Sequence, residues 1–552
     1  MGFDTSGNPT FRKYNLLRKR PNVMGMSTAD VEVDLVLQRK QRANVLHYGV
    51  VLLLLLTVLV FGLRLFSVLR FGSLFTSTGI EEAPIYSVWK VAHHYPLYES
   101  PLSGNYGLGL YNWLFYTFYG SLIRGMGLDA SALILAGRMI TLTFAGLGCV
   151  GFRLVLRRVA PRLTPTWAWM LSALVWADSG EAGWWQFSVR ADFAALAAAT
   201  WAFWFWIGSI QDRKTRLALA ASLLFYAAWS FKQTTVLLFV ACCLIVLIAQ
   251  RWMAGFVALI IPFGVLVVAT FVAGGRNYYL NTIFAPSINA FVASTGIAEI
   301  AKAILASPFL WICGLVGFSE LLSQKVSTGH GGSLRSPITQ VLLLGYLLCV
   351  VGDGLGICRL GSARNTLLEA FLVSAILACI VLSDMPASGE ASSRKTVRNA
   401  ALLIAATANV LVLSGRLISL PGLGRLTVAS SDDFASRLKL AKSMEDLPAP
   451  VLIREGILTL PWYANKNHYP AVMDDYLFYQ AALQRGDLKE YPIQVLVASH
   501  HFRSLLVTEQ DPALGWALEA GCRMNASQTF SEWSLTRIDC AGSKDATIAG
   551  KE

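Results

Sequence analysis

The stretch that decides the fold is VVLLLLLTVLVFGL at residues 50–63, followed by GIEEAPIYSVWKVAHHYPLYESP at residues 79–101. The first is the centre of an apolar run long enough to cross a bilayer as a helix. The second places two adjacent acids, Glu81 and Glu82, just beyond that span. A mostly lipid-soluble chain keeps charge near the bilayer where the charge is used or well paired. We therefore expect an active site that starts at these acids and faces the far side of the membrane.

Composition places the chain among membrane proteins. Of its 552 residues, 55% are hydrophobic and 14% are charged, whereas soluble domains carry about 25% charged residues. The formal net charge is +12. The basic residues fall in short segments between apolar runs, which is the positive-inside pattern of membrane proteins. We therefore expect membrane lipids around the chain and no nucleic-acid partner.

The apolar runs predict a polytopic α-helical membrane protein with about eleven transmembrane helices. A small C-terminal α/β domain is expected outside the membrane, because the composition becomes that of a soluble domain after the last span. The predicted spans lie at roughly 48–69, 131–153, 163–179, 191–210, 215–231, 234–250, 254–274, 303–320, 337–353, 366–383 and 398–416.

The sequence divides into three regions. Residues 1–46 are expected to be a basic cytoplasmic tail, residues 47–417 the transmembrane module, and residues 418–552 the extracytoplasmic domain. The module includes a long outer loop at residues 70–130, whose aromatic amphipathic stretches are typical of helices in the membrane interface. The basic loops lie on the side of the N-terminus, so the N-terminus is predicted to be cytoplasmic and the C-terminal domain periplasmic, in a bacterial inner membrane.

In the C-terminal region, APVLIREG and FRSLLVTEQ are expected to be buried strands, and DDYLFYQAALQRG a helix that ends at Gly486. NASQTFSEWSLTRIDC indicates strands or a hairpin. Cys522 and Cys540 flank this last stretch, and a disulfide between them is expected if the region lies outside the cytoplasm. The other seven cysteines lie in or beside apolar spans and are interpreted as packing residues.

Several charged residues lie on the predicted outer face, where the positive-inside pattern does not explain them. Lys232, in FKQTT, follows a span closely and suits a phosphate as a point charge with three donors; a snorkelling lysine is the alternative. Arg190 lies near Trp184 and Trp185 at the start of another span, where an ion pair with Asp192 is one expectation. The tryptophans are either an aromatic belt at the interface or a surface on which a sugar ring stacks.

A second basic group lies in GICRLGSARNTLLEAFLV. Arg359 and Arg364 precede an outer-face span, and either arginine is suited to hold a lipid-linked phosphate by paired donors. Glu369 lies inside apolar sequence and needs a partner, for which Arg364 is a candidate. A purely structural ion pair is the alternative interpretation.

Taken in order, these segments resemble the GT-C superfamily of membrane glycosyltransferases. The resemblance is to bacterial relatives of protein O-mannosyltransferases and lipid A aminoarabinose transferases. EEAPIY stands where those proteins carry an Asp-Glu pair, followed by HHYPLYESP, GRMITL, RADFAALA, FKQT and GSARNTLLEAF. The resemblance covers roughly residues 48–420, and Glu81 departs from it by replacing the usual aspartate.

The resemblance implies transfer of a sugar from a polyprenyl-phosphate-linked donor to an extracytoplasmic glycan, lipid or protein, with inversion. It implies Glu81 or Glu82 as the carboxylate base and Lys232 as the phosphate holder, with Arg364 or Arg359 in support. The donor, the acceptor and the membrane lipids are then the partners. The sequence decides neither for nor against a divalent metal, and it requires no other cofactor.

Other classes of membrane protein remain as alternatives. A transporter or flippase of lipid-linked saccharides predicts inverted repeats and charges at the membrane midplane, and the sequence shows no repeat. An O-antigen ligase or polymerase predicts essential Arg and His residues in a late outer loop and no early acid pair. A binding role through the C-terminal domain leaves the clustered charges at the outer rim unexplained.

Overall fold

The structure is a computed structural model. It describes residues 28–71, 81–100, 109–128, 130–178, 180, 185–323, 336–383, 393–418, 439, 451–453, 476–502, 504–508, 511–530 and 533–539, with some side chains in these ranges left undescribed. The chain forms two compact units, residues 1–48 and residues 49–552. The first unit holds the beginning of a long helix, α1 (Thr28–Phe71), so helix begins within the expected tail.

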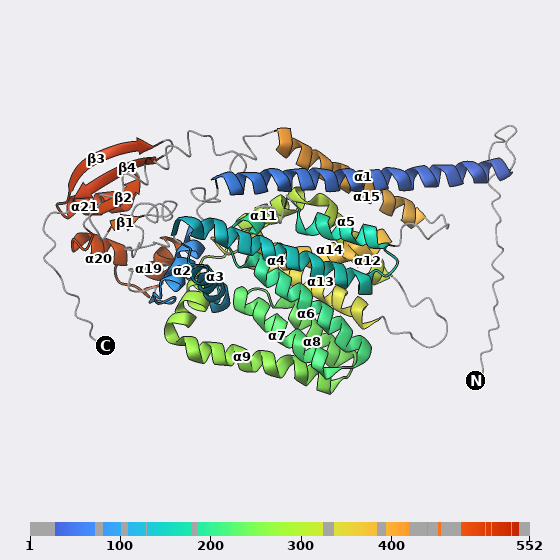
Figure 1. Ribbon diagram of the computed structural model, residues 1–552, viewed down its shortest axis with the longest axis horizontal. Helices are drawn as coiled ribbons and strands as arrows, with labels where there is room; N and C mark the ends of the chain where they lie inside the picture. Colours follow the sequence, from blue (N-terminus) through green and yellow to red (C-terminus); the bar gives the residue numbers. More distant parts are fainter. Residues whose placement is uncertain are drawn as a thin grey trace, which may run out of the picture. The chain divides into compact units, whose positions relative to one another are not determined.

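Long apolar helices make up most of the second unit (Figure 1). By length and composition, six helices in the described residues can cross a membrane, or seven if one bent pair counts as a span. Their spanning parts are residues 47–70, 132–159, 192–212, 253–288, 337–356 and 364–383. The main helices concerned are α4 (Ala130–Val159), α6 (Asp192–Asp212), α9 (Met253–Tyr279), α13 (Pro337–Gly356) and α14 (Leu368–Ser383).

By this criterion, the described residues contain fewer membrane spans than the eleven that the sequence predicts. Helices do occupy the remaining predicted segments. Helices α5 (Pro165–Trp176), α7 (Thr215–Phe231) and α8 (Leu237–Leu244) with the π-helical η2 (Ile245–Ala249) are shorter, whereas α15 (Ser393–Ile418) is long but its apolar part is limited to Ala400–Gly415. The predicted span 303–320 is broken. Helices α11 (Ala293–Ala306) and α12 (Pro308–Ser323) meet there at an angle of 98°, because Pro308 has no backbone N–H to continue α11.

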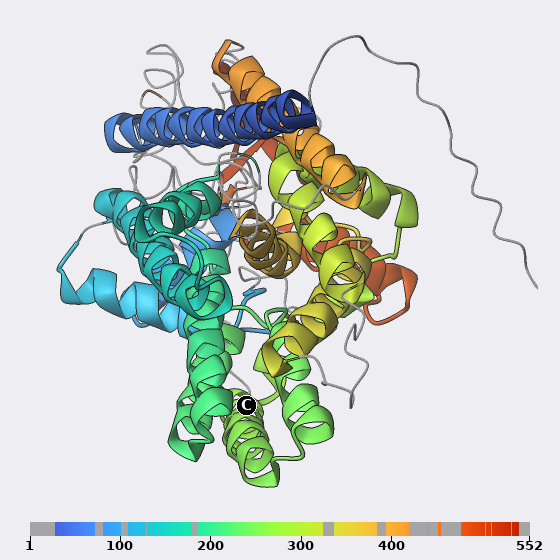
Figure 2. The same cartoon turned by 90° about the vertical axis from the view of Figure 1, so that its right-hand side faces the viewer.

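Helix α14 lies in the middle of the other helices (Figure 2). Its apolar window is 83% buried, and that of α6 is 78% buried, against 6% for α9. The first turns of α6 are rich in alanine, and small side chains allow neighbouring backbones to approach closely in membrane bundles. The N-terminal ends of α6 and α14 are therefore enclosed by protein.

Two short amphipathic helices, α2 (Glu82–Ala92) and α3 (Trp113–Gly125), form within the expected outer loop. They pack on each other and on α4 through a core that is largely aromatic, with Trp89, Tyr116 and Tyr119 each at most 1% exposed. This packing fixes the start of α2, and with it Glu81, against the membrane helices.

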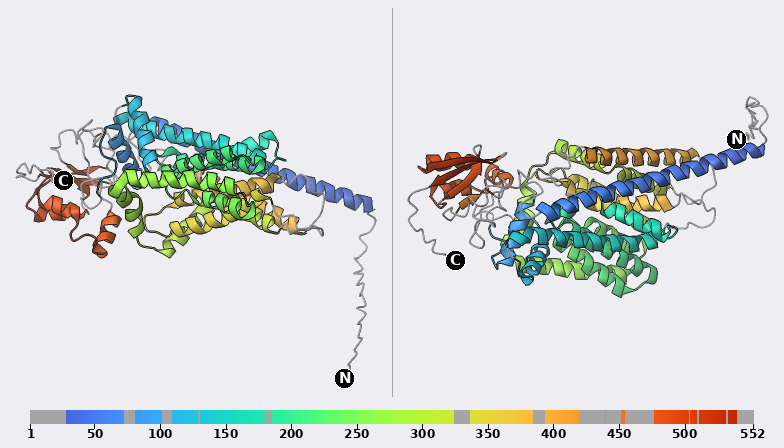
Figure 3. Two further views of the ribbon diagram at one scale, coloured as in Figure 1. Left: turned by 90° about the horizontal axis from the view of Figure 1, so that it is seen from below. Right: turned by 45° about the horizontal axis from the view of Figure 1, so that its top comes forward.

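The C-terminal region contains a four-stranded sheet in the order β1-β2-β4-β3, with β1 parallel to β2 and the other pairs antiparallel. Its elements are β1 (Val451–Ile453), α19 (Tyr476–Gln484), α20 (Pro492–Ala498), β2 (Ser504–Thr508), α21 (Pro512–Glu519), β3 (Arg523–Phe530) and β4 (Trp533–Asp539). Helices α19, α20 and α21 and strands β1 and β2 share a hydrophobic core with the short α10 (Ala285–Ile288) (Figure 3). Helix α10 directly follows the π-helical η3 (Leu280–Phe284). Cys522 is disulfide-bonded, and its expected partner, Cys540, lies outside the described residues.

Candidate functional site

Glu81, at the N-terminus of α2, is completely buried in an ion pair with Arg138 of α4. The guanidinium donates from Nε to Oε1 at 3.0 Å and from Nη2 to Oε2 at 2.7 Å. The backbone N–H of Val189 donates to Oε1 at 2.7 Å. Paired Arg–carboxylate bonds of this kind are strong and directional. The pair therefore joins α2, α4 and the segment before α6. The side chain of Glu82 lies outside the described residues.

Arg190 and Asp192 continue this buried set of charges at the start of α6. Nε of Arg190 donates to Oδ2 of Asp192 at 2.9 Å, and its Nη2 donates to the hydroxyl of Tyr111. The guanidinium also lies over the ring of Trp185, 4.6 Å from the ring centre. Burial by itself lowers the pKa of Arg190, but Tyr111 and Asp192 outweigh it and raise the pKa above its ordinary value. Arg190 is thus a fixed, buried cation.

Lys232 binds the other oxygen of Asp192. Its Nζ donates to Oδ1 of Asp192 at 2.6 Å and to the backbone carbonyl of Asn365 at 2.9 Å. The side-chain amide of Asn365 donates to the same Oδ1 at 2.9 Å. Lys232 caps the C-terminus of α7, and Asn365 lies in the 3₁₀ helix η4 (Arg364–Leu367) that leads into α14. Three segments distant in sequence therefore meet at one aspartate: the start of α6, the end of α7 and η4.

A small polar pocket lies beside this cluster, with a volume of about 10 Å³, which is room for about one water molecule. Most of its lining is polar or charged. The lining residues are Asp192, Leu196, Lys232, Thr234, Thr235, Asp353, Asn365, Thr366, Leu368 and Glu369. Lys232 is the cation in this lining, and its side chain is 10% exposed.

Asp353 and Glu369 both bind helix N-termini at this pocket. Glu369 accepts from the backbone N–H groups of Leu238 at 2.8 Å and Leu237 at 3.3 Å, which begin α8. Asp353, near the end of α13, accepts from the N–H of Ala370 at 3.0 Å, in the first turn of α14. Carboxylates are stabilised at helix N-termini by the free N–H groups and the helix dipole. The expected pairing of Glu369 with an arginine is therefore wrong.

Neither Arg364 nor Arg359 is among the residues that line the pocket. Nε of Arg364 lies 3.8 Å from Oε2 of Glu299 in α11, and its side chain is 27% exposed. Arg359 is exposed, and its Nη1 donates to the carbonyl of Ser287 at 2.6 Å. The structure does not bring Arg359 to the pocket. Of the tryptophan pair, Trp185 contacts Arg190, and Trp184 lies outside the described residues.

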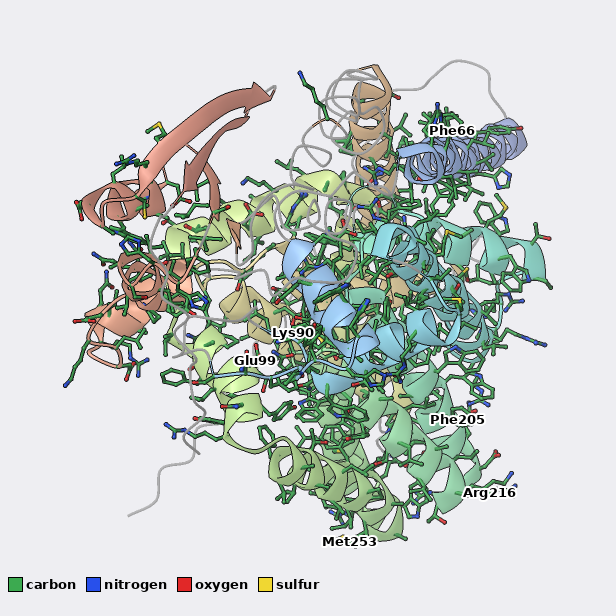
Figure 4. All side chains as sticks on the ribbon, turned by 60° about the vertical axis from the view of Figure 1, so that its left-hand side comes forward. Phe66, Lys90, Glu99, Phe205, Arg216 and Met253 are labelled. Carbon is green, nitrogen blue, oxygen red and sulfur yellow. The ribbon has the colours of Figure 1, made fainter. Side chains whose placement is uncertain are left out.

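A further buried cation lies in α2. Lys90 is 2% exposed and binds Glu99 of the following loop, with 2.8 Å between Nζ and Oε2 (Figure 4). Burial lowers the pKa of Lys90 and Glu99 opposes that effect in part. The contact ties the loop to α2. Among the described residues, no group of three or more His, Cys, Asp or Glu side chains is arranged to hold a metal ion.

No family model matches the sequence, and no curated protein matches it. Solved structures do. ArnT from Cupriavidus metallidurans, bound to undecaprenyl phosphate, aligns over 91% of this chain and 99% of its own, with a TM-score of 0.52 and 12% identity. The oligosaccharyltransferase of Archaeoglobus fulgidus in the apo form aligns over 84% of this chain and 70% of its own, with a TM-score of 0.50 and 9% identity. The chain has the GT-C fold.

Sequence reasoning named Glu81, Lys232 and Arg190 as candidates and Asp192 as an ion-pair partner of Arg190, a pair that the structure contains. Arg138 stood in a motif that carried the resemblance, and Asp353 was not singled out. Each has the same signal in the sequence, which is a charged residue in or next to a predicted span. Such residues are rare in spans and usually face the interior of a bundle or a functional site.

Proposed function

We propose that the chain transfers a sugar from a polyprenyl-phosphate-linked donor to an extracytoplasmic acceptor. The observation that carries this proposal is the pocket at Lys232, built by buried charges at one end of a GT-C fold. A fold by itself does not fix a function, so the chemistry of the pocket has to supply the argument. The bound undecaprenyl phosphate of the ArnT structure supports this class of donor.

Lys232 is the proposed holder of the donor phosphate. Its ammonium group has three N–H donors, of which Asp192 and the carbonyl of Asn365 take two. The third is left for a phosphate oxygen at the pocket. Asp192 lies between two cations, Lys232 and Arg190, so these three residues together carry one positive charge. A positive group fixed at this place stabilises the negative charge that develops on the leaving phosphate.

Glu82 is the proposed base, and Glu81 the residue that positions the start of α2. The carboxylate of Glu81 accepts three hydrogen bonds from buried donors, and such bonds make a carboxylate a weak base. In the proposed step, an acceptor hydroxyl loses its proton to Glu82. Its oxygen forms a bond to the anomeric carbon while the bond from that carbon to the phosphate oxygen breaks, with inversion. The polyprenyl phosphate leaves with the bonding electron pair.

Other residues are proposed to support this step. Arg190 fixes Asp192, and Trp185, which lies against Arg190, is proposed to border the donor site. The contact of Arg364 with Glu299 is long at 3.8 Å, so Arg364 is proposed as the second phosphate ligand. Arg359 is left out of the proposed site because it binds the Ser287 carbonyl instead.

The proposed orientation places the N-terminus in the cytoplasm and the C-terminal domain in the periplasm. Basic residues such as Arg157, Arg158 and Lys214 lie at the ends of α4 and α6 that are opposite to the pocket. The positive-inside rule assigns that side to the cytoplasm. The pocket then faces the periplasm, where lipid-linked sugars and their acceptors meet.

The test is mass spectrometry of envelope glycolipids and glycans from a deletion strain. We expect the strain to lack one sugar, and to regain it with the wild-type gene but not with Lys232→Ala at equal protein level. The missing sugar then identifies the sugar of the donor, and the molecule that lacks it identifies the acceptor. Identical glycans in the deletion and parent strains, under conditions in which the gene is expressed, would refute the proposal.

A further inference from the structure

The turn that carries Lys232 is held at both of its ends. At its start, the side chain of Lys232 binds Asp192 and the carbonyl of Asn365. Within the turn, the N–H of Thr235 donates to the carbonyl of Lys232 at 3.0 Å. At its far end, the first N–H groups of α8 donate to Glu369. The position of Lys232 therefore depends on where Glu369 places the start of α8.

The start of α14 serves as the support for both ends of this turn. Asn365 and Glu369 lie one helical turn apart, in η4 and the first turn of α14. Asp353 of α13 holds this segment through the N–H of Ala370. The span that contains α14 is the most enclosed of the candidate spans in the described residues, at 83%. A displacement of this turn would carry Lys232 with it.

The negative charge that the two carboxylates bring to the pocket is offset in part by helix N-termini. A helix N-terminus carries roughly half a positive charge, and each of Asp353 and Glu369 lies against one. The helix ends therefore offset part of the two negative charges at Lys232. The hydroxyl of Thr235 lines the pocket, is 7% exposed as a residue, and has no hydrogen-bond partner within the described part of the chain. It is a further donor for a ligand there.

We propose that Glu369 and Asp353 are positioning residues that hold Lys232 at the donor phosphate. They act through the first amides of α8 and α14 and touch neither donor nor acceptor. This inference rests on the proposed function, because it takes Lys232 as the phosphate ligand. The two oxygens of Glu369 each accept from one amide of α8, and a glutamine offers only one acceptor oxygen, so Glu369→Gln removes one of the two bonds.

The test is a double-mutant cycle on binding of undecaprenyl phosphate to the purified full chain in detergent. Glu369→Gln keeps the size of the side chain and an amide oxygen. We expect it to weaken binding about tenfold, the value of about one lost hydrogen bond. In a Lys232→Ala background the same change should weaken binding less than about twofold, because coupled residues do not add. Asp353→Asn should behave in the same way.

Glu519→Gln, an exposed glutamate in α21, is the matched control and should leave binding unchanged. Thermal unfolding of every variant separates positioning from general loss of structure. Equal weakening by Glu369→Gln with and without Lys232 would overturn the positioning role, and so would no weakening at all. If Lys232→Ala alone leaves binding unchanged, the phosphate role in the proposed function fails, and this inference fails with it.

Discussion

Replacing Glu81 by glutamine tests whether the buried ion pair with Arg138 holds the outer end of the helices together. The side chain of Glu81 is 0% exposed and that of Arg138 is 1% exposed. Removing one partner of such a pair leaves the other charge buried without compensation, which costs about 3–5 kcal/mol. Glutamine has nearly the same volume, so little of this cost comes from packing. We expect Glu81→Gln to lower the free energy of unfolding by about 3–5 kcal/mol.

The assay is denaturant unfolding of the purified chain in detergent, followed by circular dichroism. The control is the exposed pair of Asp212 and Lys214, whose side chains are 48% and 46% exposed at a separation of 2.8 Å. Exposed pairs contribute roughly 0–1 kcal/mol, so Asp212→Asn should change little. The double variant Glu81→Leu with Arg138→Met should regain most of the lost stability, because apolar residues can replace a buried pair without an unpaired charge.

The outcome that contradicts this reasoning is also specific. If Glu81→Gln unfolds at the same denaturant concentration as Asp212→Asn, the pair with Arg138 contributes no more than a surface pair. The positioning role proposed for Glu81 would then have no physical basis. Loss of sugar transfer at full stability in Glu81→Gln would instead move the base role from Glu82 to Glu81.

Four further predictions concern single residues. Glu82→Gln should abolish sugar transfer without changing the unfolding temperature, and full activity would remove it as the base. Lys232→Ala should lower kcat/KM for the donor by roughly 10–100-fold, the value of one charged hydrogen bond; unchanged donor kinetics would reject its role. Arg359→Ala should keep kcat/KM within about twofold, because its guanidinium binds the Ser287 carbonyl outside the pocket, and a large loss would return it to the site. Cys522→Ser should destabilise the C-terminal region by about 2–5 kcal/mol, seen as faster proteolysis there, and unchanged proteolysis would mean that the disulfide adds no stability.

The sequence predicted the helices well because a membrane helix needs a long apolar run, and such runs are visible without knowledge of tertiary contacts. Each predicted span contains a helix. The sequence did not predict how many of these helices are long enough to cross the membrane. The break at Ser307 and Pro308 illustrates the reason, since the bend there depends on contacts as well as on proline. The N–H of Phe309 donates to Asn409 of α15, 100 residues away.

The candidate site was predicted in part for a similar reason. Charged residues next to apolar runs are conspicuous, so Glu81, Arg190 and Lys232 were named as candidates. Their partners are set by the packing of distant helices. Arg138 is 57 residues from Glu81, and Asn365 is 133 residues from Lys232. No local pattern in the sequence pairs residues at such distances. For the same reason, choosing the nearby Arg364 as the partner of Glu369 was wrong, because Glu369 binds the first amides of α8.

The arrangement of carboxylates explains how a bundle with few charged residues can hold the buried cation Lys232. Asp192, Asp353 and Glu369 each meet either a cation or a helix N-terminus, so no carboxylate at the pocket depends on water for stabilisation. Lys232 is the cation in the lining, and it keeps one donor beyond those that Asp192 and Asn365 take. A fixed donor in a low-dielectric site interacts more strongly with a phosphate than the same group in water. The buried pair with Asp192 and the helix ends therefore leave Lys232 as the cation of the lining that has a donor available to an incoming anion.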